Sequence, residues 1–391
     1  MLPLEGIKVL DLTRVLSGPY CAMMMADMGA DVMKIEPPGI GDDSRAFGPY
    51  VNKESAYYMS LNRNKRSMVL DFKNEKHKTV FLEMVKKVDF VIENYRPGTM
   101  EKLGLGYKEV LSKINPKLIY VEISGFGATG PYMKKPAYDV VVQAMGGIMS
   151  ITGEDGGNPT RVGASIGDVA AGIFGFGAAM TALYVRTITG KGQAIDISML
   201  DCQVAMLENA IARYQVNGTS PGPIGNRHPS ITPFTDFEAK DGKIIIGVAN
   251  QKLWKNYTDL IGRPDLFEHP KFATNPLRTD NVKELFDELR PEMKKKTVDE
   301  WMKVLSDAGI PCAPINNMER LCNDPQVLSR NMLVELIHPV AGKMKVPGIP
   351  IKLSDTPGAI RTPAPTLNHD IYEILHDLFG WDKATCDSKL N

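Results

Sequence analysis

The sequence predicts an α/β fold, with a mostly parallel sheet in a large domain and a smaller α/β domain after it. The first half alternates short apolar runs of β type with helical stretches, and the connections between them are short. This alternation is typical of a parallel sheet covered by helices. Near Gly222 the pattern gives way to a proline-crowded segment, and a second α/β pattern follows. A chain of 391 residues, 43% of them hydrophobic, can form two or three domains.

Each element of the first half carries a local signal. The run Lys8–Thr13 (KVLDLT) is apolar and β-type, and Gly18-Pro19 then opens a helix, because proline early in a helix loses no hydrogen bond. Gly29 ends that helix. In chain order we expect strands at residues 8–13, 31–36, 67–71, 89–93, 118–124 and 193–198, and helices near 18–28, 76–87, 107–114 and 169–184.

Prolines mark two extended segments in the second half, near residues 221–233 and 347–365. Long extended segments inside one chain are unusual for a compact monomer. Between and after them we expect a strand at 243–248, helices near 253–261, 282–295 and 298–308, and a short amphipathic helix (IYEILHDLFG) from Asp370.

The composition disfavours several classes of partner. Lys+Arg and Asp+Glu both number 46, so the net charge of zero argues against nucleic acid or an anionic membrane. The five cysteines are far apart and lack metal-type spacing, as do the six histidines, so we expect no metal. We expect a cytoplasmic protein, because the start MLPLEGIKVLDLT is too polar for a secretory signal. The apolar stretch around 169–185 is interpreted as a buried helix, because it is rich in glycine and alanine.

Asp168 is the most informative residue of the chain. It precedes a helical run of small and apolar residues that contains three glycines, Gly172, Gly175 and Gly177. Each glycine costs a helix interior about 1 kcal/mol relative to alanine, so a bare backbone must serve close packing there. A carboxylate at a helix N-terminus is held ionised by the helix dipole, and an ionised carboxylate beside a ligand can act as a nucleophile. The alternative is an ordinary helix cap.

Two basic segments follow or precede strands. One is NRNKR at residues 62–66, and the other is NYRPG at 94–98 with Lys102 beyond it. Open α/β sheets place their ligand crevice at strand ends, and Arg and Lys there suit a phosphorylated ligand. The alternative is solvated surface charge. GFGATG at residues 125–130 matches G-x-G-x-x-G, but Pro131 follows where a helix should start, so we expect no nicotinamide or flavin cofactor.

Ordered segments along the whole chain resemble class III CoA-transferases, the family of formyl-CoA:oxalate, carnitine and bile-acid CoA-transferases. The segments are LEGIKVLDLTRVLSGPYCAMMMADMGADVMKIEPPGIGDDSR, NRNKRSMVLD, ENYRPGTMEKLGL, SGFGATGPY, PAYDVVVQAMGG, SIGDVAAGIFG, TGKGQAIDISMLD, DAGIPCAPINNMERLCNDPQ and PAPTL.

The resemblance implies an architecture. Two chains interlock like links in a homodimer, which would account for the extended proline-rich segments. We therefore expect a Rossmann-like, CoA-binding large domain at 1–200, completed by about 365–391, a linker at 201–230, a small domain at 231–325 and a return linker at 326–364.

The resemblance also implies a mechanism. Asp168 falls on the family's catalytic aspartate, which attacks a donor thioester and forms an aspartyl mixed anhydride and then an aspartyl-CoA thioester. CoA and acyl-CoA are substrates, a carboxylic acid is the acceptor, and no cofactor is permanently bound. Backbone N–H groups near Gly167 or Gly146-Gly147 are candidates to stabilise the oxyanion. The family's CoA contacts carry over to Leu16, Ser17, Lys73, Asn94, Arg96, Lys102, Tyr138 and Asp139.

Departures from the family pattern bear on the ligands. Pro38 stands where oxalate-type members can carry an Arg against the adenine. Leu16 stands where they carry a Gln, and GNRHP at residues 225–229 replaces their tetraglycine loop, so we expect oxalate to be disfavoured. Arg227 or His228 is a candidate contact for the acceptor acid.

Two other functions remain open. An α-methylacyl-CoA racemase shares the fold, but racemisation needs a base on each side of the α-carbon. Racemase members carry a His before the Asp of their G-H-D segment, and this chain has Tyr138 before Asp139. Tyrosine, with an ordinary pKa near 10, is a poor base at neutral pH. A non-catalytic acyl-CoA-binding protein is the other alternative, which the intact Asp168 segment disfavours.

Overall fold

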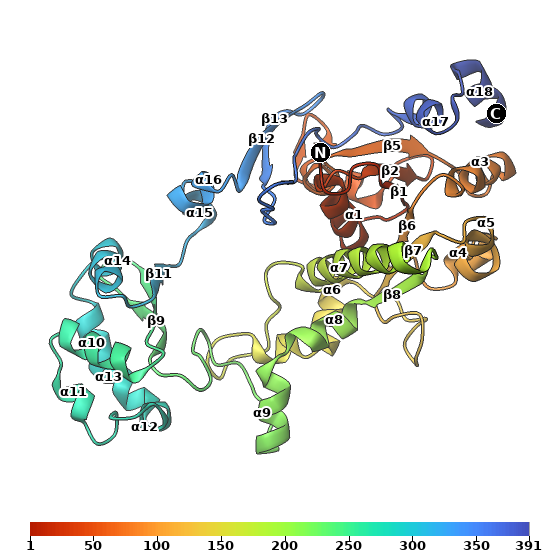
Figure 1. The fold of residues 1–391 in the computed structure, drawn as a ribbon. Coiled ribbons are helices and arrows are strands. Elements are labelled where there is room, and N and C mark those ends of the chain that lie inside the picture. The colour runs from red at the N-terminus through yellow and green to blue at the C-terminus, as the bar shows by residue number, and fades with distance from the viewer. Residues whose placement is uncertain (391) are drawn as a thin grey trace. The chain divides into compact units, whose positions relative to one another are not determined.

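The computed structural model describes residues 1–390, and these form two compact units (Figure 1). The large unit contains residues 1–148, 161–212 and the chain from 325 onward. The small unit contains residues 149–160 and 213–324. The sequence places 149–160 in the large domain, but Gly153 O accepts from Gly225 N and Pro223 O accepts from Gly156 N, which ties that segment to the start of the small unit.

The large unit is built on a six-stranded parallel sheet, as the alternation of strands and helices predicts. The strands are β1 (Lys8–Asp11), β2 (Asp31–Glu36), β5 (Lys65–Val69), β6 (Phe90–Glu93), β7 (Ile119–Ser124) and β8 (Ala194–Ser198). Their order is β5-β2-β1-β6-β7-β8. The order reverses between β1 and β6, and a doubly wound sheet binds its ligands outside the carboxyl ends of the strands at such a reversal.

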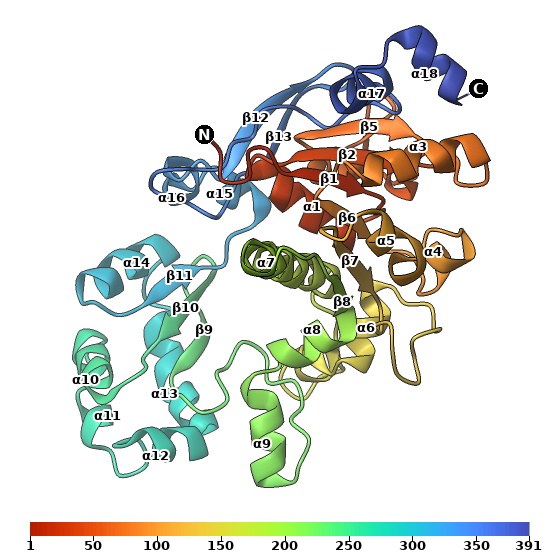
Figure 2. The same cartoon turned by 45° about the vertical axis from the view of Figure 1, so that its right-hand side comes forward.

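Helices cover both faces of this sheet (Figure 2). Helices α1 (Ser17–Asp27) and α7 (Ile166–Thr189) pack on one face, and α3 (Glu75–Val85) and α17 (Ile371–Phe379) pack on the other. Both faces are buried, so β1 is apolar at consecutive positions: Val9 belongs to one core and Leu10 to the other. The remaining elements of the sheet's surroundings are η1 (Asp43–Ala46), β3 (Tyr50–Val51), β4 (Glu54–Ser55), α2 (Ala56–Leu61), α4 (Thr99–Lys102), the π-helical turn Tyr107–Leu111, α5 (Ser112–Ile114), α6 (Asp139–Met145), α8 (Met199–Met206) and α18 (Lys383–Leu390).

Two of the three glycines that follow Asp168 in α7 allow close packing. A Cβ on Gly172 would lie 2.9 Å from Ser17 O of α1, and one on Gly175 would lie 3.1 Å from Ile123 Cδ1 of β7. A Cβ on Gly177 would meet nothing within 4 Å. By length and apolar composition α7 is also the one described helix that could cross a membrane. Its packing against α1 and the sheet places it in the core of the large unit.

The small unit has its own sheet and core. Strands β9 (Phe234–Glu238), β10 (Lys243–Gly247) and β11 (Cys312–Pro314) form an antiparallel sheet in the order β11-β10-β9. Apolar residues of this sheet pack against the helices around Trp254, Leu289 and Trp301, all buried. The remaining elements are η3 (Ile148–Ile151), α10 (Gln251–Leu260), α11 (Asp265–Glu268), α12 (Asn275–Asp280), α13 (Val282–Met293), α14 (Val298–Asp307) and α15 (Met318–Cys322).

The two segments predicted as linkers contain secondary structure. Residues 201–230 include most of α8 and all of α9 (Asn209–Asn217). Residues 326–364 include most of α16 (Pro325–Ser329) and a hairpin of β12 (Leu333–His338) and β13 (Gly342–Pro347). The hairpin strands alternate more and less exposed residues, a period-2 pattern that the flanking prolines obscure in the sequence.

Candidate active site

Two loops lie side by side where the strand order reverses. One follows β1 and the other follows β6. The Asn94 side chain joins them, because its Oδ1 accepts from Arg14 N at 2.8 Å and its Nδ2 donates to Arg14 O at 2.8 Å. The same Nδ2 donates to Ser17 Oγ at 3.3 Å. Asn94, a predicted CoA contact, therefore uses its side chain to shape the crevice.

Buried charges hold the loop after β1 in an unusual conformation. Val15 has a φ of 67°, which a β-branched residue rarely adopts. Its N–H donates to Asp42 Oδ1 at 3.0 Å, and Lys34 Nζ lies 2.9 Å from Asp42 Oδ2. Lys34 Nζ also donates to Thr13 O at 2.8 Å. Backbone groups of three consecutive loop residues are thus fixed by side chains from other elements.

Asp168 lies in the first turn of α7, facing this loop. The N-terminal cap of α7 is Ser165, so Asp168 does not occupy the capping position. Burial and the Asp139 carboxylate raise the pKa of the Asp168 carboxyl to about 7, although a hydrogen bond from Ser17 acts to lower it. The sequence predicts that the helix dipole keeps Asp168 ionised. Burial and a neighbouring like charge outweigh that effect.

Asp139 anchors the N-terminus of α7. Its Oδ1 accepts from Gly167 N at 2.9 Å, and its Oδ2 accepts from Gln143 Nε2 at 2.8 Å. Arg161 lies 3.8 Å from the same carboxylate. The Asp139 side chain is buried, and its oxygens are already hydrogen-bonded within the protein. Asp139, another predicted CoA contact, thus positions the helix that carries Asp168.

A pocket of about 150 Å³ connects these groups. Ligand pockets commonly measure about 300–1,000 Å³, so this one can enclose only part of a CoA thioester. Asp168 is the one acidic residue among the described residues that line it, and three basic residues, Arg14, Arg96 and Lys135, line it as well. The predicted site residues that meet here are Leu16, Ser17, Asn94, Arg96, Tyr138 and Asp168. Lys73, Lys102 and Asp139 are not among the lining residues.

Comparisons with known proteins identify the family of this chain. Residues 4–371 match the model of CoA-transferase family III. The chain belongs to this family. A crystal structure of a CaiB/BaiF family protein from Brucella suis superposes with a TM-score of 0.86 at 37% identity, covering 96% of this chain and 99% of that one.

Two curated relatives of this transferase are named for the acids that they use. An acetyl-CoA:oxalate CoA-transferase of Acetobacter aceti is 45% identical, with 90% of this chain and 89% of the relative covered. A human succinyl-CoA:glutarate CoA-transferase is 39% identical, with 97% and 87% covered. The first name runs against the expectation that oxalate is disfavoured, which stays a prediction.

Two of the backbone N–H groups that are candidates to stabilise the oxyanion already donate within the protein. Gly146 N donates to Val142 O at 2.7 Å. Gly167 N donates to Asp139, as described above. Neither N–H is therefore available to a substrate oxygen in this conformation. The prediction depended on the positions of glycines in the sequence, which do not reveal long-range hydrogen bonds.

The basic segment 62–66 has a structural role, and its interpretation as part of a phosphate site is wrong. Arg63 is buried and lies 2.7 Å from Asp27, and Lys65 is buried and lies 2.9 Å from Asp11. Arg66 pairs with Asp31 at 2.7 Å. These pairs also exclude the alternative of solvated surface charge for Arg63 and Lys65, because the two side chains are nearly inaccessible to water.

Tyr57 is a neighbour of the site that the sequence does not indicate. Burial raises the pKa of its phenol to about 12, and the Asp168 carboxylate is the next cause. Tyr57 therefore lies within electrostatic range of Asp168. It belongs to the short helix α2, whose sequence AYYMSL carries no catalytic motif that could have identified it.

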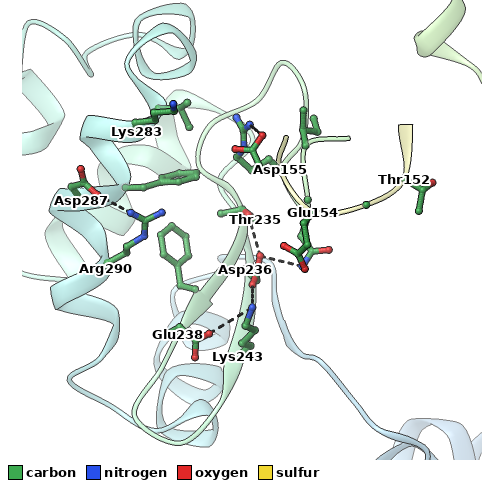
Figure 3. Close-up of a pocket in the computed structure, with 18 of the residues that line it drawn as sticks. Thr152, Glu154, Asp155, Thr235, Asp236, Glu238, Lys243, Lys283, Asp287 and Arg290 are labelled. Atoms are coloured by element: carbon green, nitrogen blue, oxygen red, sulfur yellow. Dashed lines mark hydrogen bonds and ion pairs between the residues drawn. The ribbon is translucent and has the colours of Figure 1, made fainter. Parts of the chain in front are cut away.

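A larger cavity of about 950 Å³ lies within the small unit (Figure 3). Its charged groups are largely paired with one another: Lys243 lies 3.0 Å from Asp236, and Arg290 lies 2.7 Å from Asp287. Arg227 lines it and pairs with Asp155 at 2.9 Å. His228, the other candidate contact for the acceptor acid, packs its ring 5.6 Å from that of Phe234. Size alone does not make this cavity the reaction site, because paired charges dominate the described residues that line it.

Proposed function

We propose that Asp168 is the covalent nucleophile of this CoA-transferase and that the acceptor is a small dicarboxylic acid. One observation carries the proposal: among the described residues, Asp168 is the single acid in a pocket lined by three basic residues, at the reversal of strand order. A carboxylate nucleophile and positively charged surroundings suit a reaction in which every participating group is an anion or becomes one.

The reaction proceeds by exchange of acyl bonds without net proton transfer. An Asp168 oxygen attacks the donor thioester carbon, the C–S bond breaks, and CoA leaves as a thiolate. The thiolate then attacks the Asp168 carbonyl carbon of the anhydride, and the donor acid leaves as a carboxylate. The acceptor carboxylate attacks the resulting aspartyl-CoA thioester and releases the thiolate again. The thiolate finally attacks the acceptor's acyl carbon and frees the Asp168 carboxylate.

The covalent steps conserve the thioester's free energy. Each intermediate is an activated acyl group that water can hydrolyse, so the pocket must exclude water while it is occupied. The pocket around Asp168 is small, at about 150 Å³, so a bound thioester would displace most of the water in it. Arg96 and Lys135 line the pocket and would stabilise the thiolate and the free carboxylates between steps. Arg14 also lines it, but it pairs with Asp43 at 3.0 Å.

The names of relatives support a dicarboxylic acceptor. Oxalate, glutarate and mesaconate occur in the names of relatives that are 36–45% identical and match at least 90% of this chain. All three are dicarboxylic acids. One carboxylate of such an acid would attack the aspartyl thioester, and the other would be available to the basic residues of the pocket.

The proposal includes an interlocked homodimer. Helix α7 exposes large apolar side chains at Ile173, Phe174, Tyr184 and Ile188, of which the last two are each 68% exposed. Exposed apolar groups of this kind typically mark a contact surface. Light scattering after dilution to nanomolar concentration should still give the mass of two chains. A folded, active monomer would contradict the interlocked assembly.

Asp168→Asn tests the nucleophile. We expect transfer from succinyl-CoA to glutarate to fall by several orders of magnitude, because an amide cannot attack a thioester. Hydroxylamine added to wild-type protein and succinyl-CoA should convert Asp168 to a hydroxamate, located by peptide mass mapping. The Asn variant should remain folded, with a thermal midpoint at pH 8 no lower than that of the wild type. Near wild-type transfer in this variant, or trapping at Asp139, would refute the assignment.

A product assay separates the three candidate functions. Succinyl-CoA is mixed with oxalate, mesaconate or glutarate, with acetate and butanoate as monocarboxylate controls, and new thioesters are identified by mass. A transferase forms a new thioester, and we expect the dicarboxylates to react fastest. A racemase would instead incorporate α-deuterium from heavy water into a 2-methylacyl-CoA. A binding protein would do neither.

A further inference from the structure

Ser17 lies between two groups of the site. It is the first residue of α1 and is almost fully buried, at 4% exposure. Its hydroxyl oxygen accepts a hydrogen bond from Asn94 Nδ2 at 3.3 Å, and Ser17 and Asp168 line the same pocket. Asn94 is itself fixed by two hydrogen bonds to the Arg14 backbone, so the hydroxyl is oriented by a rigid neighbour.

The packing of α1 on α7 brings Ser17 to this position. A Cβ on Gly172 would lie 2.9 Å from Ser17 O and 3.0 Å from Tyr20 Cβ, so only glycine lets the two helices approach so closely. Gly172 is one turn after Asp168 on α7. The close approach therefore brings Ser17 near the turn of α7 that carries Asp168.

We propose that Ser17 is a positioning residue that keeps Asp168 ionised and holds its carboxylate for attack, through the chain of hydrogen bonds from Asn94 to Ser17 to Asp168. This inference rests on the proposed role of Asp168 as the nucleophile. A hydrogen bond to one carboxylate oxygen leaves the other oxygen free to attack, and a donor favours the charged form over the neutral acid.

Groups on several elements packed around Asp168 influence its ionisation. Asp139 of α6 opposes that ionisation, and Arg161 lies 3.8 Å from the Asp139 carboxylate. Tyr57 of α2 is neutral at physiological pH, since its pKa is raised to about 12. Arg14, Arg96 and Lys135 line the same pocket. Ser17 is the hydrogen-bond donor that lowers the pKa of Asp168, so it opposes burial and Asp139 directly.

This role differs from the CoA contact that the family resemblance predicts for Ser17. A residue that only contacts CoA would change KM for the thioester by the same factor at every pH. A residue that keeps Asp168 ionised would change the pH at which the nucleophile becomes active. In wild-type protein, acylation should be lost as the pH falls through about 7, because the attacking form is the carboxylate.

The test measures single-turnover acylation by succinyl-CoA between pH 5.5 and 9.5, with the rate of covalent adduct formation followed by intact-protein mass. The acid limb is the part of the pH–rate profile in which acylation slows as the pH falls. In Ser17→Ala this limb should move to higher pH. Acylation at pH 6 should then be about tenfold slower for each pH unit that the limb moves, and it should approach the wild-type rate at pH 9.5. Ser17→Thr keeps the hydroxyl and should restore the wild-type limb. Ser112→Ala, which removes a hydroxyl bonded only to Lys108 O, is the matched control.

The outcomes are distinct. An unshifted acid limb in Ser17→Ala, or an equal loss at every pH that Ser17→Thr does not rescue, overturns the role of Ser17 and leaves the nucleophile intact. A wild-type protein that forms no adduct on Asp168 at any pH overturns both proposals. Thermal midpoints for all four proteins show whether a rate change reflects unfolding.

Discussion

The two basic segments, 62–66 and 94–102, have similar compositions but opposite environments. In the first, Arg63 and Lys65 are buried, each within 3 Å of a carboxylate oxygen. In the second, Arg96 and Lys102 are exposed, and Arg96 borders the Asp168 pocket. Both segments lie next to strands of the same parallel sheet. The first contributes to stability and the second is free to bind a ligand.

Counter-charges, and not basic residues alone, decide the role of each segment. Arg63 and Lys65 meet Asp27 and Asp11, which are 36 and 54 residues away in sequence. A buried ion pair costs desolvation that its hydrogen bonds must offset, so removing one partner is far more damaging than removing an exposed charge. Three substitutions and one change of salt concentration test this contrast.

Arg63→Met should have the largest effect. It leaves the buried Asp27 carboxylate without its bidentate partner and removes the hydrogen bond to Pro347 O. We expect the free energy of unfolding to fall by about 3–5 kcal/mol. Urea unfolding at pH 7.5 measures it, with Arg96→Met as the exposed control, expected within about 0.5 kcal/mol of wild type. Equal stability of the two variants would remove the contrast between the segments.

Arg96→Met should instead weaken binding. Arg96 is exposed at the edge of the pocket, and a charge-assisted contact to a ligand phosphate or carboxylate is worth about 1.5–3 kcal/mol. Titration calorimetry with CoA should therefore show a loss of about 10- to 150-fold in affinity. The measurement uses Asp168→Asn protein as the background, so that turnover does not interfere. Unchanged affinity would show that Arg96 is a solvated surface charge that does not contact CoA.

A rise in salt concentration should weaken CoA binding at the second segment but not the buried ion pairs of the first. We expect this effect to be smaller than those of Arg63→Met and Arg96→Met. Raising NaCl from about 0.05 to 0.5 M shortens the Debye length from roughly 14 to 4 Å and screens exposed charges. CoA affinity should fall several-fold, whereas the stability difference between wild type and Arg63→Met should persist, because buried pairs are screened little. If the stability difference disappeared at high salt, the Arg63–Asp27 pair would have to be accessible to water.

Lys102→Met should have the smallest effect. Lys102 is exposed at the end of α4 and does not line the Asp168 pocket, although the family resemblance predicts a CoA contact for it. We expect CoA affinity to change by less than about threefold, in keeping with an isolated surface charge. A loss as large as that of Arg96→Met would show that the bound ligand extends along α4.

Local patterns predict the elements that depend on neighbours in sequence. The parallel sheet follows from apolar runs bounded by glycine and proline. The pattern around Asp168 is equally consistent with a helix cap, and the family resemblance is what makes this residue the candidate nucleophile. The features that the sequence does not reveal are contacts between residues that lie far apart along the chain. Asp139 reaches Gly167 across 28 residues, and Asn94 reaches Arg14 across 80. Such contacts leave no periodic signal, so Asp139 and Asn94 are recognisable as supports of the site only in the folded chain.

The hairpin β12–β13 escapes prediction for a related reason. Prolines around it indicate an extended linker, but the two strands pair from Leu333 and Pro347 to His338 and Gly342, next to the turn. Gly342 has a φ of 80°. Its register depends on pairing between two strands and not on either strand alone.

The neighbourhood of Asp139 and Asp168 has a consequence for the energies along the reaction. In the free enzyme the two carboxylates repel each other in a largely buried site. In the proposed mechanism, Asp168 carries no charge once it is acylated, as the anhydride or as the CoA thioester, and the repulsion vanishes. The free enzyme is thereby raised in energy relative to both covalent intermediates, which favours acylation at the start of the cycle. The same repulsion opposes the last step, so release of the free carboxylate must be driven by formation of the product thioester.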